Sequence, residues 1–183
     1  MSTPATQAPV AGNWTIDKVH SHIGFSVKHM VVATFRGSFD AYEASLTAAD
    51  DGAPVLHGTV DADSLVVKDE NLAAHLKSPD FFDTATYPQI SFSSTSAIVG
   101  EDGSLEVEGD LTIKGNTHRV TGRGTLSGPH TDIAGNEKIG IELEAVIDRR
   151  EYGLEWNAPL PKGGFALEND VKLAVSLELV KEA

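Results

Sequence analysis

Apolar and polar residues alternate along most of this chain, and the clearest alternation lies between His22 and His29. One face carries Ile23, Phe25 and Val27 and ends in His29, while the intervening residues are polar or small. A period of two is typical of a β-strand with one buried and one solvent-facing side. We therefore predict a strand here whose apolar row ends in an imidazole.

The same alternation recurs in seven further segments separated by short turns. It predicts strands at residues 35–46, 56–62, 90–99, 105–113, 120–126, 139–147 and 171–179. Turn residues at 100–103 and 114–116 connect neighbouring segments as hairpins. One short helix is predicted between the third and fourth strands, capped by Asp69 or Asn71 and stopped at Ser78-Pro79.

These elements predict an all-β fold, a single antiparallel β-barrel of about eight strands, because an open sheet of such strands would expose its edges. A closed barrel of this size has an interior that holds side chains or one small ligand. The predicted inner face is apolar but includes Gly37, Gly58, Gly109, Gly122 and Gly124. Inward glycines indicate either tight coiling of the barrel or a cavity, and the sequence leaves both open.

Length, composition and charge limit the domain organisation and the classes of binding partner that we expect. The 183 residues fit one domain, with residues 1–12 expected as a disordered leader and 13–183 as the barrel. The formal net charge of −13 disfavours nucleic acid and anionic membrane surfaces. No apolar run is long enough for a membrane span. The first residues lack the basic and apolar parts of a signal peptide, so we expect a cytoplasmic protein.

Three histidines, His20, His22 and His29, lie close enough in sequence to suggest a metal site. Strand parity places His29 on the opposite face from the other two, so a site would need ligands from elsewhere. We predict instead a bend or bulge at His20-Ser21 where polar side chains bond the backbone, and we predict no metal. The chain has no cysteine and no nucleophile-elbow or phosphate-loop motif, so we predict no catalytic residue and no cofactor.

Six motifs, in order, resemble those of the YceI-like family, and together they span residues 14 to about 180. They are I-D-x-x-H-S-x-I-x-F-x-V-x-H (16–29), F-x-G-x-F (35–39), H-L-x-S-x-x-F-F-D (75–83), Y-P-x-I-x-F-x-S (87–94), G-x-L-T-I-x-G (109–115) and R-x-x-Y-G-L (149–154). The resemblance implies an elongated, lipocalin-like barrel with a long apolar tunnel. It also implies binding of a polyisoprenoid or similar amphipathic lipid, such as a prenyl diphosphate or a prenylated quinone.

On this resemblance and the inner-face pattern we predict a non-enzymatic carrier or storage protein for such a lipid. The predicted tunnel residues are Phe25, Val27, Phe35, Phe39, Phe81, Phe82, Phe92, Leu111 and Ile141. The predicted head-group residues are His29, Arg36, Tyr152 and Trp156, and Arg149 and Arg150 also offer guanidinium groups to an oxygen-rich head. Each buried methylene contributes about 0.8 kcal/mol. Association costs roughly 4–15 kcal/mol, so useful affinity needs a long chain.

Two other functions remain open from the sequence. The barrel is compatible with an enzyme that acts on a small apolar substrate with His29 as acid or base. It is also compatible with a stress-related module that binds protein partners through its acidic face. A homodimer is possible, and its interface would use outward apolar residues such as Val146 and Val180.

Overall fold

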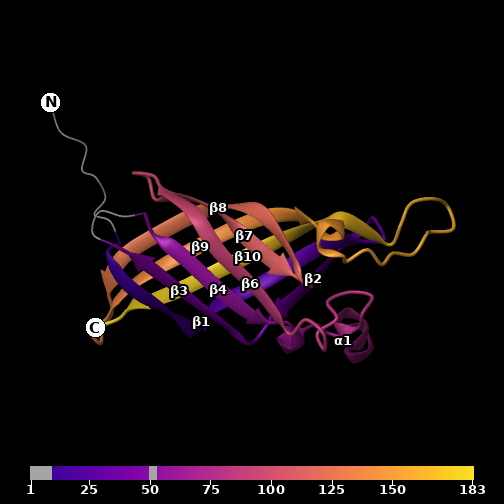
Figure 1. The fold of residues 1–183 in the computed structure, drawn as a ribbon, viewed down its shortest axis with the longest axis horizontal. Helices are drawn as coiled ribbons and strands as arrows, with labels where there is room; N and C mark the ends of the chain where they lie inside the picture. Colours follow the sequence, from indigo (N-terminus) through magenta and orange to yellow (C-terminus); the bar gives the residue numbers. More distant parts are fainter. Residues whose placement is uncertain (1–9, 50–52) are drawn as a thin grey trace.

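The structure, a computed structural model, describes residues 10–49 and 53–183. In Figure 1 the start of β1 and the C-terminus lie at one end of a long barrel, and α1 lies at the other. Its strands are β1 (Gly12–His29), β2 (Ala33–Phe39), β3 (Tyr42–Ala48), β4 (Val55–Asp61), β5 (Leu65–Val66), β6 (Gln89–Val99), β7 (Ser104–Ile113), β8 (Asn116–Thr131), β9 (Glu137–Asp148) and β10 (Leu167–Lys181). Its helices are the 3-10 turns η1 (Ala62–Ser64) and η2 (Arg149–Tyr152) and the α-helix α1 (Glu70–Lys77).

The sheet closes through β1, which pairs with β10 along one edge and with β3 and then β2 along the other. Every strand pairing is antiparallel, and the ring within the described residues runs β1-β3-β4-β6-β7-β8-β9-β10. The predicted all-β fold, one closed antiparallel barrel of eight strands, is confirmed. Closure satisfies the backbone groups that an open edge would leave unpaired.

The predicted second strand, 35–46, is two strands that separate at Asp40-Ala41. The amide of Asp40 donates to the carbonyl of Ser64 at 3.1 Å, and the amide of Ala41 donates to Oγ of Ser64 at 3.0 Å. These bonds take the place of hydrogen bonds between neighbouring strands at this point. β2 therefore lies outside the eight-strand ring, where it pairs with β1 and with the short β5. Within the described residues the one α-helix is where the sequence predicts it, with Oδ1 of Asp69 accepting from the amide of Leu72 at 2.8 Å.

The predicted bulge at His20-Ser21 is confirmed by a register shift in the β1–β10 pairing between Asp17 and His22. Oγ of Ser21 donates to the carbonyl of Asp17 at 2.7 Å and accepts from the amide of Glu178 at 3.0 Å. Most of the expected leader, residues 1–9, lies outside the described residues. Val10, within the expected leader, is already buried in the packed cluster ahead of β1, and its carbonyl accepts from Nε1 of Trp14 at 3.1 Å.

Two groups of packed side chains occupy the barrel interior. The first fills the end where β1 starts and β10 ends, here called the closed end, around Trp14, Ile139 and Leu179, each no more than 2% exposed. The second lies toward α1 and the 153–166 loop and includes Phe39, Phe81 and other apolar residues. In the part of the chain that is described, no helix combines the length and apolar character needed to cross a bilayer.

Candidate functional site

A cavity of about 470 Å³ runs inside the barrel from the closed end toward α1. Ala44, Leu56, Val107 and Leu177, which belong to the packed closed end, form its floor. Side chains from α1 and from the 153–166 loop line its other end, here called the mouth. The cavity is therefore blind, with its mouth at the α1 end of the barrel.

The strands turn apolar side chains into this cavity, as their alternation predicts. The predicted tunnel residues that line it are Phe25, Val27, Phe35, Phe39, Phe81, Phe82, Phe92 and Leu111. Four of these rings pack together: the centroid of Phe25 lies 5.8–6.2 Å from those of Phe35, Phe39 and Phe82. The last of these, Phe82, comes from the loop after α1, so this loop adds an aromatic wall that no strand supplies.

Three predicted site residues do not line the cavity. Ile141 has the expected inward parity but is 1% exposed within the packed closed end, beyond the cavity floor. Arg36 lies on the outer face of β2 and is exposed. Tyr152 is fully buried in η2, edge-on to His118 with 5.1 Å between ring centroids. Parity identifies the face of a strand but not the height along the barrel axis, which explains the misplacement of Ile141.

His29 and Trp156 line the cavity, and the structure adds His75 at the mouth. Contact of any of them with a head group stays a prediction. The His75 ring is edge-on to Trp156 at 4.8 Å and to Phe81 at 5.0 Å, and its Nε2 is 3.0 Å from Oδ2 of Asp80. Sequence reasoning missed His75. Its spacing of three from Leu72 on the predicted helix places both residues on one face, and this signal was available.

Arg149 also lines the cavity, although it is only 4% exposed. Its Nε donates to the carbonyl of Glu168 at 2.9 Å, and its Nη1 donates to the carbonyls of Leu154 and Trp156 at 2.5 and 2.9 Å. Burial lowers the pKa of this guanidinium. Among the described residues it contacts no carboxylate, since Asp148 bonds Arg150 instead. A buried positive charge with only carbonyl partners favours an oxygen-rich group near it.

The inward glycines divide into two kinds. Gly58 and Gly122 line the cavity, and a Cβ there would have no atom closer than 3.6 and 3.7 Å, respectively. At Gly37 a Cβ would lie 2.6 Å from the Phe25 ring, and at Gly109 and Gly124 it would lie 2.5 and 1.8 Å from backbone oxygens. The first pair leaves room for a ligand, and the other three allow close approach of strands and rings. Both readings left open by the sequence therefore hold, at different positions.

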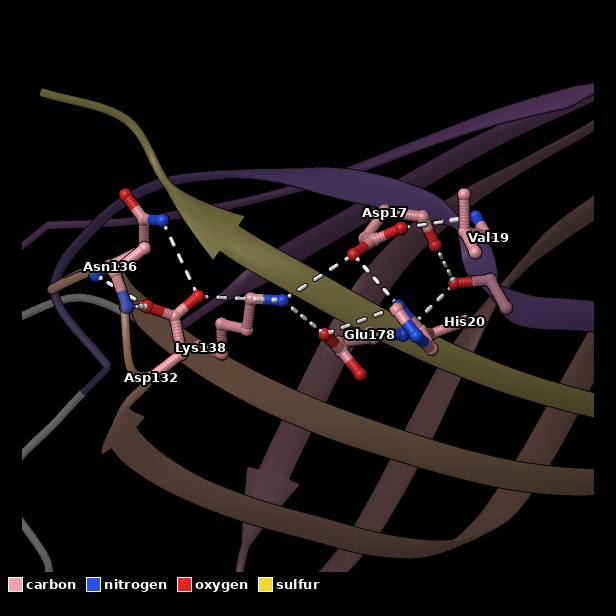
Figure 2. Close-up of polar contacts among 9 residues, drawn as sticks. Asp17, Val19, His20, Asp132, Asn136, Lys138 and Glu178 are labelled. Atoms are coloured by element: carbon pink, nitrogen blue, oxygen red, sulfur yellow. Dashed lines mark hydrogen bonds and ion pairs between the residues drawn. The ribbon is translucent and has the colours of Figure 1, made fainter.

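A separate polar cluster lies on the outside of the barrel at the β1 bulge (Figure 2). Nδ1 of His20 is 3.1 Å from Asp17 and 3.8 Å from Glu178, an arrangement of ligand types that suits a metal ion. Nζ of Lys138, however, lies 2.6 Å from Glu178 and 3.4 Å from Asp17, so an ammonium group already supplies the positive charge. The bond to His20 lowers the pKa of Asp17, and the bond to Glu178 raises that of Lys138. The cluster joins β1, β9 and β10, and the absence of a metal stays a prediction.

The sequence profile of the YceI-like domain matches residues 14–179 of this chain. A UPF0312 protein of Staphylococcus aureus (strain USA300) is 35% identical over 169 residues, which cover 91% of this chain and 96% of the relative. The chain belongs to the YceI-like family. The family assignment made from the sequence motifs is thus confirmed, and the cavity described above is that of a YceI-like barrel.

Solved structures share this YceI-like fold. BcnA of Burkholderia cenocepacia superposes with a TM-score of 0.75 at 22% identity, covering 89% of this chain and 98% of that one. A YceI protein of Campylobacter jejuni, in a variant with monobromobimane as guest, gives 0.71 at 25% identity, covering 92% and 98%. A polyisoprenoid-binding domain from Saccharophagus degradans gives 0.69 at 14% identity, again covering 92% and 98%.

Proposed function

We propose that this YceI-like protein binds one long-chain amphipathic lipid of the isoprenoid class and carries or stores it without chemical change. The observation on which this proposal rests is the blind cavity with an almost wholly apolar lining, whose mouth is lined by His29, His75 and Arg149 among others. Such a shape suits a molecule with a long apolar tail and one polar end. The description of the Saccharophagus degradans domain as polyisoprenoid-binding supports the isoprenoid class.

The size of the cavity sets the scale of the tail. A cavity of 470 Å³ accommodates on the order of 15 carbon-sized groups, if each takes about 30 Å³, as a water molecule does in the liquid. Three isoprene units have that many carbons. At about 0.8 kcal/mol for each buried group, the gross gain is about 12 kcal/mol. Association costs of roughly 4–15 kcal/mol consume much of it, so a tail that fills the cavity is needed for useful affinity.

The head of the ligand is proposed to lie at the mouth, near Arg149, His75 and His29. A guanidinium group and imidazoles are suitable partners for phosphate oxygens or quinone carbonyls. Prenyl phosphates and isoprenoid quinones are therefore the head-group classes to test. Trp156 lies against His75 and closes one side of this region.

The alternative of an enzyme with His29 as acid or base has less support. His29 reaches the cavity mouth but makes no side-chain hydrogen bond among the described residues. His75 has the partner expected of an oriented base, since Asp80 bonds its Nε2. In the described residues, however, no hydroxyl group bonds either imidazole, so neither has a nucleophile to activate. We therefore propose binding without turnover.

Uptake of a C15 prenyl quinone, measured by quenching of intrinsic tryptophan fluorescence, tests the proposal. The wild-type protein should take up one quinone and return it unaltered on extraction. Gly122→Leu, which fills the cavity, should weaken uptake at least tenfold, whereas Ile133→Ser, a surface change at the closed end, should not. No uptake of prenyl quinones or prenyl phosphates by the wild type, or recovery of a converted product, would contradict it.

A further inference from the structure

The turn between β1 and β2 exposes apolar side chains at its tip. Met30, Val31 and Val32 are 43%, 67% and 86% exposed, respectively. Phe165, in the loop before β10, is 59% exposed. We call these four residues the apolar tip. Single exposed apolar residues are ordinary on protein surfaces, whereas a contiguous group of them indicates a binding surface.

The four residues form one surface, and it lies at the cavity mouth. The amide of Met30 donates to the carbonyl of Ala166 at 2.8 Å, which ties the turn to the loop that carries Phe165. Val31 and Phe165 border the same shallow surface hollow, together with Arg150, Glu168 and Asp170 among others. Met30 and Ala166 also line the cavity. A molecule docked on the apolar tip would therefore touch the entrance of the cavity.

The backbone of the turn shows that apolar residues are costly at these positions. Met30 and Val31 have φ values of +52° and +67°, in the left-handed region that Gly and Asn adopt readily. A β-branched residue such as Val31 is strained there, and its side chain also stays exposed to solvent. Neither feature helps folding, so the side chains favour a role in contact with an apolar partner.

The charges around the apolar tip differ from those on the barrel wall. On the wall the cations are neutralised: Lys18, Arg119, Arg123 and Lys172 each pair with a carboxylate. Three cations near the apolar tip differ in this respect: Lys28 in β1, Arg36 in β2 and Lys162 in the 153–166 loop. All three are exposed, and within the described residues none has a carboxylate within 4 Å. In a chain of net charge −13, these three cations are free at the end that carries the mouth, although the carboxylates of Glu168 and Asp170 border the hollow beside the tip.

We propose that the apolar tip docks on the surface of a phospholipid bilayer and turns the cavity mouth toward the membrane. The apolar side chains would enter the interfacial layer, and the free cations would face headgroup phosphates. The inference rests on the proposed lipid-binding function, because an isoprenoid lipid resides in a bilayer and must pass between bilayer and cavity. The negative charge of the rest of the chain makes a zwitterionic surface the better partner.

Sedimentation with phosphatidylcholine vesicles, using the full-length protein, tests this proposal. The test variant is Val31→Asn with Val32→Ser, since Asn suits the left-handed turn and the fold should be kept. Ile133→Ser is the matched control, because Ile133 is fully exposed in the β8–β9 turn at the closed end. We expect the tip variant to lower the vesicle partition coefficient at least tenfold and the control to leave it unchanged.

The same variants separate this proposal from the function on which it rests. Uptake of the prenyl quinone from detergent micelles should stay unchanged in the tip variant, whereas uptake from vesicles should become slower. Equal vesicle binding by wild type and tip variant would overturn the docking proposal while leaving lipid binding intact. The docking proposal would also be overturned if the tip variant converted a dimer to a monomer without changing vesicle binding. Failure of quinone uptake from micelles by the wild type would instead overturn the lipid-binding function.

Discussion

The imidazole of His75 stands edge-on to the indole of Trp156, with 4.8 Å between ring centroids and 86° between planes. One residue comes from α1 and the other from the 153–166 loop, so this contact joins two separate segments across the cavity mouth. Phe81, 5.5 Å from Trp156, completes the group. These rings restrict the opening through which a lipid would pass.

The rings at the mouth should control how fast a ligand leaves. Removing the indole with Trp156→Ala should raise the dissociation rate of a bound prenyl quinone roughly tenfold, since an aromatic contact contributes about 0.5–1.5 kcal/mol beyond burial. Stopped-flow transfer to empty acceptor vesicles measures this rate. Tyr87→Ala, which removes a ring that is 38% exposed and does not line the cavity, is the control. Equal rates in the two variants would contradict a gating role for the mouth.

Stability and ligand binding should respond to different residues. Ile141→Ala should lower the free energy of unfolding by about 2–5 kcal/mol, because it opens a void in the packed closed end, yet it should not alter quinone affinity. Phe82→Ala should enlarge the cavity. It should therefore lower the free energy of unfolding less than Ile141→Ala does, and it should shift the binding preference toward longer tails. Urea unfolding and titration with C10, C15 and C20 quinones measure both. A change of tail preference in Ile141→Ala would contradict the position given to the cavity floor, because it would show that Ile141 affects the bound tail.

Two inward glycines should tolerate alanine very differently. At Gly124 a Cβ would meet the carbonyl oxygen of Glu142 at 1.8 Å, so Gly124→Ala forces two strands apart and should cost more than about 3 kcal/mol. At Gly58 the nearest atom is 3.6 Å away, and Gly58→Ala should stay within about 1 kcal/mol of the wild type. Thermal and urea unfolding compare the two. Similar losses at both positions would contradict the division into cavity-lining and close-approach glycines.

Acid should weaken the turn that carries Arg149. The Arg150 hydrogen bonds hold the pKa of Asp148 at about 2 in the folded protein, below an ordinary value near 3.9. A lowered folded pKa gives stability that is complete above the unfolded value and is lost as pH falls from about 4 toward 2. Asp148→Asn should therefore be less stable at pH 6 and should lose less stability than the wild type between pH 4 and 2. Parallel losses in the two proteins over that range would exclude this contribution.

Local pattern was enough to predict most of the strands, the barrel and the six tunnel residues that lie on strands, because a period of two fixes which side chains face inward. Phe81 and Phe82 lie in a loop, where no such period applies. The bulge at His20-Ser21 was also predictable from polar residues that interrupt the alternation. The break between β2 and β3 was not, since it depends on Ser64, which only the fold brings near Ala41.

The sequence does not show how far along the barrel axis an inward-facing side chain lies. Ile141 and Leu111 look alike in pattern, yet the first lies in the closed end and the second lines the cavity. The mouth residues His75 and Arg149 come from helices and are placed by packing between distant segments. Arg149 was a candidate from its charge, and the spacing of His75 from Leu72 was a usable signal. Their positions at the mouth, however, depend on contacts with residues far along the chain or in a loop, which only the three-dimensional structure shows.

Native mass spectrometry of the protein, purified without detergent or organic solvent, tests the central claim most directly. We expect a population carrying one noncovalent adduct per chain, which dissociates on collision and has the mass of an isoprenoid lipid. Gly122→Leu should lose that adduct, and Ile133→Ser should retain it. A wild-type spectrum without any adduct, both as purified and after incubation with prenyl quinones and prenyl phosphates, would contradict a lipid-binding cavity.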